Sequence, residues 1–202
     1  MQEIHYERLY AKIADDLAIL GYSIITQALP LEFNKRLLGL CSNASGFAQA
    51  AIVGGSNALV DAQRRSSAIR WLDEDMFTQS EFLGFARGLQ LYLNRHLYLG
   101  LRYYESHFAI YKEGDFYEKH LDALKRSKNR VVTTVYYLDE AWSESDGGEL
   151  IIYDEAQKIL QKVTPESGTL VVFLSERFPH EVLPTKRERH SIAGWFRIDK
   201  VA

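Results

Sequence analysis

Helical periodicity dominates the first hundred residues of the chain. The first periodic segment, which Gly21 should end, carries apolar residues three or four positions apart with charged residues between them. These apolar residues are Tyr6, Tyr10, Ile13 and Leu17. A second helix is predicted from Pro30 to about Cys41, because proline is well tolerated in the first turn of a helix. A third is predicted over about 80–99. Its apolar stripe comprises Phe82, Phe85, Leu89, Tyr92 and Leu93.

The second half of the chain reads as short strands. Segments rich in Val, Ile, Tyr and Phe are separated by turn signals such as Asp146-Gly147-Gly148. The expected strands are 103–111, 130–138, 149–153, 169–173, 180–183 and 190–198, with a shorter one at 22–26. Such spacing favours a sandwich or jelly roll over alternating strand and helix units. Helices followed by strands predict an α+β fold in which the helices buttress one sheet.

The segment from about 42 to 70 fits neither pattern. It is polar, carries Gly46, Gly54 and Gly55, and contains the pair Arg64-Arg65. We interpret it as a β-hairpin or lid near an active site, since long segments with weak periodicity are often functional loops. A disordered insertion without a role is the alternative. We expect one domain over 1–202, with helical support and this loop in 1–100 and the core in 101–200.

Composition and charge exclude several classes of protein. The 202 residues carry a net charge of −3, and basic and aromatic residues are not interleaved, so we expect no nucleic-acid partner. Cys41 is the single cysteine, which rules out an intramolecular disulfide and favours a reducing, cytoplasmic location. No apolar run approaches the length of about 20 residues that spans a membrane. The charged N-terminus lacks the pattern of a signal peptide.

His120-Leu121-Asp122 is the first candidate for metal chemistry. Residues two apart in an extended segment face the same side, so the imidazole and the carboxylate can reach one ion. His180 lies at the start of another expected strand. Two histidines and one carboxylate on one face leave open coordination positions, which is the ligand set of non-haem Fe(II) oxygenases. Taken alone, the pair His120 and Asp122 is a weak signal, and a surface histidine beside a solvated aspartate is the favoured explanation of such a pair.

Arg189 is the second candidate, nine positions after His180. Its planar guanidinium can grip a carboxylate with two hydrogen bonds, and a 2-oxoacid bound to the metal would extend its far carboxylate toward such a group. Strand parity places Arg189, Ser191, Ala193 and Trp195 on one face. Arg189 also ends the charged run that begins at Lys186, so a place on the surface remains open.

Three other reactive side chains have weaker patterns. His107 shares a strand face with Tyr111 by parity, which fits a pocket position, although a hydrogen-bonded structural histidine is favoured. His190 has no partner pattern in the sequence. Cys41 is best explained as a small apolar filler, because no histidine and asparagine pattern supports thiol catalysis.

Several motifs in order carry a family resemblance. They are YKEGDFYEKHLD at 111–122, VYYLD at 135–139, GGELIIY at 147–153 and PHEVLP at 179–184, continuing to Arg189 and Trp195. From about residue 102 to 199 the chain resembles the catalytic domain of the prolyl 4-hydroxylase superfamily of Fe(II)/2-oxoglutarate dioxygenases. It is most similar to the hypoxia-factor prolyl hydroxylase branch and its bacterial relatives. Arg65 and Trp71 resemble the end of that family's finger loop.

The resemblance implies a double-stranded β-helix, or jelly roll, and assigns roles. It makes His120, Asp122 and His180 the iron ligands and Arg189 the salt-bridge partner of 2-oxoglutarate. The Tyr137 hydroxyl would assist Arg189, and Tyr111 would stand near the metal-chelating end of the co-substrate. Strand parity adds side chains to the pocket lining. These are Thr133, Val135, Leu150, Val182 and Trp195.

The resemblance also predicts the reaction. The chain would hydroxylate a prolyl residue of a protein substrate with Fe(II) and O2, converting 2-oxoglutarate to succinate and CO2, with ascorbate as a possible reductant. A protein with an exposed proline loop, such as a bacterial translation factor, is the implied partner. Two other functions stay open at this point: the same chemistry on a small molecule such as a free amino acid, and a non-catalytic jelly-roll binding module.

Overall fold

The structure, a computed structural model, describes residues 6–50, 52–53, 58–59, 64–72, 77–122 and 129–199. Within these residues the helices are α1 (Glu7–Ile19), α2 (Leu31–Asn43) and α3 (Phe77–Leu97), with a 3₁₀ turn at Glu144–Asp146. The strands are β1 (Tyr22–Ile25), β2 (Ala48–Gln49), β3 (Ile52–Val53), β4 (Ala58–Leu59), β5 (Ala68–Trp71), β6 (Tyr103–Tyr111), β7 (Tyr117–His120), β8 (Arg130–Tyr137), β9 (Leu150–Tyr153), β10 (Ile159–Val163), β11 (Leu170–Leu174), β12 (His180–Val182) and β13 (Arg189–Arg197).

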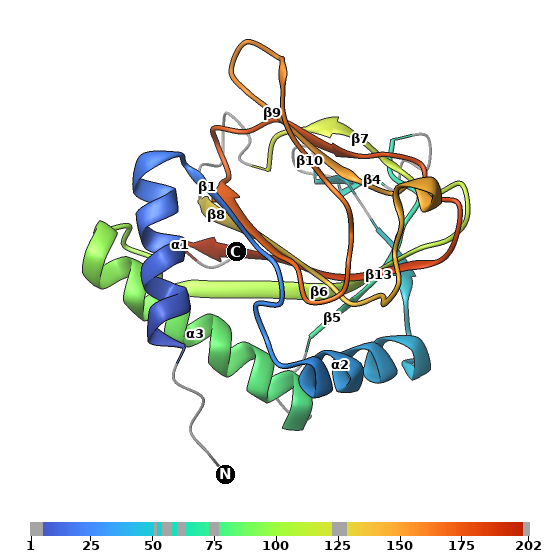
Figure 1. Ribbon diagram of the computed structural model, residues 1–202, viewed down its shortest axis with the longest axis horizontal. Helices are drawn as coiled ribbons and strands as arrows, with labels where there is room; N and C mark the ends of the chain where they lie inside the picture. The colour runs from blue at the N-terminus through green and yellow to red at the C-terminus, as the bar shows by residue number, and fades with distance from the viewer. Residues whose placement is uncertain are drawn as a thin grey trace.

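Two antiparallel sheets, built mainly from the second half of the chain, face each other. The larger sheet has the strand order β1-β11-β8-β13-β6-β5-β2, and the smaller has the order β10-β9-β12-β7. In Figure 1 the smaller sheet lies above the long strands β6, β8 and β13. From β7 onward the chain alternates between the two sheets, except that β9 and β10 form consecutive strands of the smaller sheet, as in a double-stranded β-helix. This arrangement confirms the predicted α+β jelly roll.

The helices cover the outer face of the larger sheet (Figure 1). Their buried stripes form one core with the side chains that β6, β8 and β13 direct outward, such as Phe108, Tyr136 and Phe196. A second cluster fills the space between the sheets and contains Tyr111, Tyr137 and other pocket-facing residues. The alternation of strand side chains therefore divides the molecule into a helix-covered core and an inner cavity.

Apolar periodicity and turn residues in the sequence predicted most of the helices and strands. Gly21 follows α1 with a φ of 83°, and its N–H donates to the carbonyls of Asp16 and Leu17, so glycine ends the helix as predicted. Pro30 stands at the start of α2 as expected. The strand β10 was missed, because its sequence ILQKV lacks regular apolar and polar alternation and most of it lies exposed at the edge of the smaller sheet.

The 42–70 segment is partly a hairpin, as predicted. β3 and β4 pair antiparallel within it, while β2 and β5 extend the larger sheet beyond β6. Residues 51, 54–57 and 60–63 of this segment lie outside the described residues. Arg65 forms a bridge with Tyr117 of the smaller sheet, so the end of the segment reaches the inner cavity.

Cys41 is a buried core residue, in agreement with its expected role as an apolar filler. Its side chain is fully buried on α2, and burial, helped by the Asp139 and Glu188 carboxylates, raises the pKa of the thiol to about 12. Alkylation requires the thiolate, so we expect iodoacetamide to leave the native protein unmodified at pH 8. Mass spectrometry should show one added group only after denaturation. Complete labelling of the native protein would contradict this placement.

None of the helices in the described part of the chain combines the length and apolar character required to cross a membrane.

Candidate metal centre and active site

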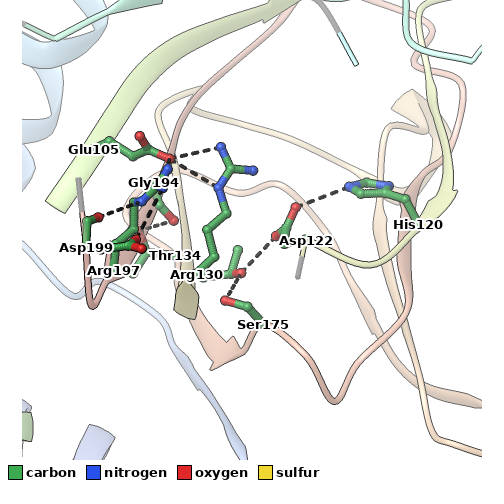
Figure 2. Close-up of polar contacts among 10 residues, drawn as sticks. Glu105, His120, Asp122, Arg130, Thr134, Ser175, Gly194, Arg197 and Asp199 are labelled. Carbon is green, nitrogen blue, oxygen red and sulfur yellow. Dashed lines mark hydrogen bonds and ion pairs between the residues drawn. The ribbon is translucent and has the colours of Figure 1, made fainter. Parts of the chain in front are cut away.

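Two histidines meet across the smaller sheet at one end of the inner cavity. His120 ends β7 and His180 begins β12, and the two residues are direct partners in the antiparallel pair. Directly opposed residues are the closest neighbours on a sheet face, and the two ring centres lie 4.3 Å apart. Asp122 follows the end of β7 by two residues and turns back toward them. Figure 2 shows Asp122 between His120 and Ser175.

The three side chains converge on one point. Asp122 Oδ1 lies 3.6 Å from His120 Nε2, and Asp122 Oδ2 lies 3.5 Å from His180 Nε2. One ligand atom from each residue can be chosen so that all three lie within 4.8 Å of one another. The predicted constellation is therefore brought together, and the reading of His120 as an isolated surface residue is not supported.

Backbone carbonyls fix the orientation of both imidazoles. His120 Nδ1 lies 2.7 Å from the Glu118 carbonyl oxygen, and His180 Nδ1 lies 3.0 Å from that of Phe178. A carbonyl oxygen can only accept, so each Nδ1 must carry the proton. In the neutral ring the Nε2 lone pair is then free and directed toward the common point. A hydrogen bond from Nδ1–H to a backbone carbonyl fixes the tautomer and the ring orientation in this way at many metal-binding histidines.

Burial sets the charge of the group. Burial and the neighbouring His120 together lower the pKa of His180 to about 4, against the opposing effect of the Asp122 charge. Burial would raise the pKa of Asp122, but His180 and His120 outweigh it and hold that pKa below its ordinary range. Neutral His180 and ionised Asp122 at neutral pH form a donor set suited to a divalent metal ion.

Arg189 lies in the same cavity and is 1% exposed. Its guanidinium carbon lies 4.8 Å from the ring centre of Tyr111 and 4.9 Å from that of Tyr137. Among the described residues, no carboxylate lies within ion-pair distance of Arg189, and neither its Nε nor the Tyr137 hydroxyl has a hydrogen-bond partner. A buried cation without a counter-charge is costly, so the cavity is built to receive an anion.

Comparisons with known proteins agree with this geometry. Residues 106–197 match the model of the 2OG-Fe(II) oxygenase superfamily. A prolyl-4-hydroxylase structure from Pseudomonas putida is 36% identical, with a TM-score of 0.86, and the alignment covers 95% of this chain and 100% of that one. The chain belongs to the 2OG-Fe(II) oxygenase superfamily.

Two further relatives extend the comparison. A prolyl hydroxylase from Trichoplax adhaerens, solved with a peptide of the hypoxia inducible factor oxygen degradation domain, is 26% identical with a TM-score of 0.85; the alignment covers 95% of this chain and 90% of that one. The hypoxia-inducible factor prolyl hydroxylase of Caenorhabditis elegans is 40% identical over 91 residues, which are 44% of this chain. The match spans only 12% of that longer protein.

The residues present fit the groups that this oxygenase superfamily uses, namely Fe(II), 2-oxoglutarate and O2. Two imidazoles and a carboxylate match an Fe(II) site with open positions. Arg189, which has no ion-pair partner among the described residues, and the Tyr137 hydroxyl match the far carboxylate of a dicarboxylic acid. Burial raises the pKa of Tyr137 to about 12 despite the nearby Arg189, so its hydroxyl stays protonated and can donate.

The cavity lining contains most of the side chains expected by strand parity. Thr133, Val135, Leu150, Val182 and Trp195 face it together with Tyr111 and Arg189, whereas Tyr137 is fully buried against Arg189 and is not part of the lining. Tyr117 also lines the cavity and stacks on His120, with ring centres 3.6 Å apart. Sequence reasoning missed Tyr117, because a register shift in the β7–β12 pair places residues three apart on the same face.

Thr133 does more than line the cavity of the oxygenase. Its hydroxyl donates to Asp122 Oδ2 at 2.8 Å and lies 2.8 Å from Ser175 Oγ. Because the single hydroxyl proton of Thr133 is used on Asp122, Ser175 must donate to Thr133. This directed chain, drawn in Figure 2 from Ser175 to Asp122, holds the carboxylate so that Oδ1 stays available to the metal.

Replacing Thr133 by valine should weaken metal binding. Valine keeps the volume but removes the donor to Asp122, and loss of an outer hydrogen bond to a metal ligand costs about tenfold or more in metal affinity. Thr133→Ser keeps the hydroxyl and should bind metal like the parent protein. Calorimetric titration with Co(II) measures both variants. Equal affinities for the valine and serine variants would refute this role for the hydroxyl.

Arg130 and His107 border Trp195 on the larger sheet. The Arg130 guanidinium carbon lies 3.8 Å from the Trp195 ring centre, and Glu105 accepts hydrogen bonds from Arg130 and Arg197 (Figure 2).

His107 packs between Trp71 and Trp195, and burial lowers its pKa to about 3. Its Nδ1 lies 3.2 Å from the Phe108 carbonyl oxygen, so the structure favours the structural reading of His107.

Proposed function

We propose that this protein is an Fe(II)- and 2-oxoglutarate-dependent dioxygenase that hydroxylates a prolyl residue of a protein substrate. The observation that carries the proposal is the pairing of the His120, Asp122 and His180 cluster with a buried Arg189 that has no counter-charge among the described residues, all in one cavity. The similarity to prolyl hydroxylases in fold and in sequence supports the choice of a prolyl substrate.

In this proposal each side chain has one task. His120 and His180 bind the iron through Nε2, and Asp122 binds it through one carboxylate oxygen. Arg189 and the Tyr137 hydroxyl hold the far carboxylate of 2-oxoglutarate, which orients its oxoacid end toward the metal. When bound, iron supplies the oxidative chemistry in which O2 and 2-oxoglutarate yield succinate, CO2 and the hydroxylated substrate.

Further tasks fall to the cavity walls. Leu150, Val182 and Trp195 exclude water from the bound co-substrate. Tyr117 flanks the metal end, where it stacks on His120, and Tyr111 lies against Arg189 rather than at the metal-chelating end first expected for it. We propose that residues 101–200 form the catalytic core and that 1–100 support it. We place the finger segment, about 42–70, beside the substrate, because its Arg65 is 7% exposed and lies over the Tyr117 ring at 4.7 Å.

The partner proposed is a protein that presents proline in an exposed loop, with a bacterial translation factor as the first candidate. We propose a cytoplasmic reaction that uses ascorbate as reductant. The test compares the host proteome with the active enzyme and with the His120→Ala variant by mass spectrometry. A peptide that gains the mass of one oxygen atom on proline only with the active enzyme supports the proposal. Oxygen gained only on free amino acids would contradict a protein substrate.

A further inference from the structure

The first two residues of β13 extend beyond one of its neighbouring strands. β13 pairs with β6 along its whole length, beginning at Arg189↔Tyr111. Its ladder with β8 begins only at Ser191↔Tyr137, because β8 ends there. Arg189 and His190 therefore lack a β8 partner within the regular ladder. Arg189, which we propose holds the co-substrate, is therefore supported by β6 but not by β8.

Asp139 provides the missing support. Its Oδ2 accepts the backbone N–H of His190 at 2.5 Å, and its Oδ1 lies 2.8 Å from the His190 ring Nδ1. One carboxylate thus holds both the backbone and the side chain of the residue next to Arg189, in place of a strand carbonyl. No pattern in the sequence indicated a partner for His190. The structure pairs it with Asp139, 51 positions away, and leaves His190 6% and Asp139 9% exposed.

Asp139 is itself held firmly. The Ser167 N–H donates to its carbonyl oxygen at 2.9 Å, and the Leu138 N–H donates to the His190 carbonyl oxygen at 3.2 Å. Asn34 of α2 donates to the Leu138 carbonyl at 3.0 Å. The end of β8 is therefore anchored to α2 and to the turn before β11, and it transmits that position to β13.

The His190 ring adds charge to the pair. Its Nε2 lies 3.3 Å from a carboxylate oxygen of Glu188, in an ion-pair contact that lacks hydrogen-bond alignment. Burial alone would lower the pKa of His190, but its hydrogen bond to Asp139 and the charges of Asp139 and Glu188 raise it. A charge-assisted hydrogen bond is about twice as strong as a neutral one, so Asp139 binds this ring tightly.

Arg189 depends on this backbone support more than most arginines. Alternation along β13 directs His190 to the outer face and Arg189 into the cavity. The Arg189 head has no ion-pair partner among the described residues, and its nearest hydrogen-bond acceptor, Ser191 Oγ, is 3.5 Å away. The direction of the guanidinium is therefore set by its backbone, by the flanking tyrosine rings and by close packing against Gly148.

We propose that Asp139 and His190 form a positioning clamp that fixes Arg189 for the far carboxylate of 2-oxoglutarate. This inference rests on the proposed function. Neither residue of the clamp touches the co-substrate; both act through the backbone of β13. Loss of the clamp should weaken 2-oxoglutarate binding, while metal binding and the maximal rate at saturating 2-oxoglutarate stay close to those of the parent protein.

The test is a double-mutant cycle on 2-oxoglutarate affinity, measured by calorimetry with the Mn(II)-loaded protein without oxygen. Asp139→Asn keeps the volume but offers one acceptor oxygen instead of two, and we expect about a tenfold rise in Kd, as for other outer-shell partners. His190→Phe removes only the ring donor and should give a smaller rise. Glu32→Gln, at an exposed carboxylate that pairs with Lys35 on α2, is the control and should bind like the parent.

The cycle separates positioning from general damage. In an Arg189→Ala background, Asp139→Asn should cause no further loss of 2-oxoglutarate affinity, because the group that it positions is gone. An equal loss in both backgrounds, or parent-like binding by both Asp139→Asn and His190→Phe, would overturn the clamp. If the parent protein itself binds Mn(II) but no 2-oxoglutarate, that result contradicts the proposed function, and the clamp, which rests on it, is contradicted as well.

Discussion

The His180→Ala variant is expected to lose iron and 2-oxoglutarate turnover together. His180 is 5% exposed, and its Nε2 is one of only two imidazole donors in the cluster. Its removal leaves Asp122 and His120 as a two-residue site. We expect Fe(II) affinity to fall by more than about a hundredfold, beyond the usual cost of losing an outer-shell partner, and succinate formation to reach background. Iron content after desalting and succinate release measure the two effects.

A matched histidine variant controls for general damage. His96 of α3 is exposed and stacks on Tyr92, far along the chain from the cluster, so His96→Ala should retain iron and turnover. Thermal unfolding without metal should be similar for the two variants, since neither removes a large apolar group. Retention of stoichiometric iron by His180→Ala would show that His180 is not a metal ligand.

The second large effect is expected at Arg189. Removing one partner of a desolvated ion pair costs about 2 to 5 kcal/mol, which corresponds to a rise of roughly thirtyfold to several thousandfold in the KM for 2-oxoglutarate. Arg189→Ala should therefore show that rise, while the iron affinity is unchanged. Arg189→Lys keeps the charge but loses the planar fork, so its KM for 2-oxoglutarate should lie between those of the parent protein and Arg189→Ala. Steady-state turnover at varied 2-oxoglutarate measures both variants.

Arg189 should favour 2-oxoglutarate binding while lowering the thermal stability of the protein without 2-oxoglutarate. Without an anion, the buried Arg189 is an uncompensated charge, so Arg189→Met should unfold at a higher temperature than the parent protein when no 2-oxoglutarate is present. Adding 2-oxoglutarate with Mn(II) should raise the unfolding temperature of the parent only. Arg187→Met is the control: Arg187 is partly exposed and stacks on Trp142. A lower unfolding temperature for Arg189→Met would mean that Arg189 has a stabilising partner.

Local patterns predicted those parts of the fold and the site that depend on short spacing. Helix ends at Gly21 and Pro30, and the strands that carry Thr133, His180 and Trp195, follow from periodicity and turn residues, which act over a few positions. The convergence of His120, Asp122 and His180 was predictable as a hypothesis, because each stands at or near the end of a strand. Only the facing sheets bring the two histidines into register.

Other contacts depend on tertiary structure and leave no local signal. Tyr117 reaches the cavity through a register shift that simple alternation does not foresee. The Asp139 and His190 pair joins the ends of two strands, and its partners have no fixed spacing in the sequence. Thr133 was expected in the lining by parity, but its hydrogen bond to Asp122 required the bend after β7. Such contacts arise from strand order, which residue patterns constrain only weakly.

The central claim is that three protein donors hold one metal ion beside an arginine that receives the co-substrate. Anomalous diffraction from crystals of the protein grown with Zn(II), as an air-stable substitute for Fe(II), and 2-oxoglutarate tests it most directly. We predict one strong peak at about 2.0 to 2.2 Å from His120 Nε2, His180 Nε2 and an Asp122 oxygen, with the far carboxylate of 2-oxoglutarate against Arg189. A fully bound metal elsewhere, or a co-substrate carboxylate away from Arg189, would contradict the account.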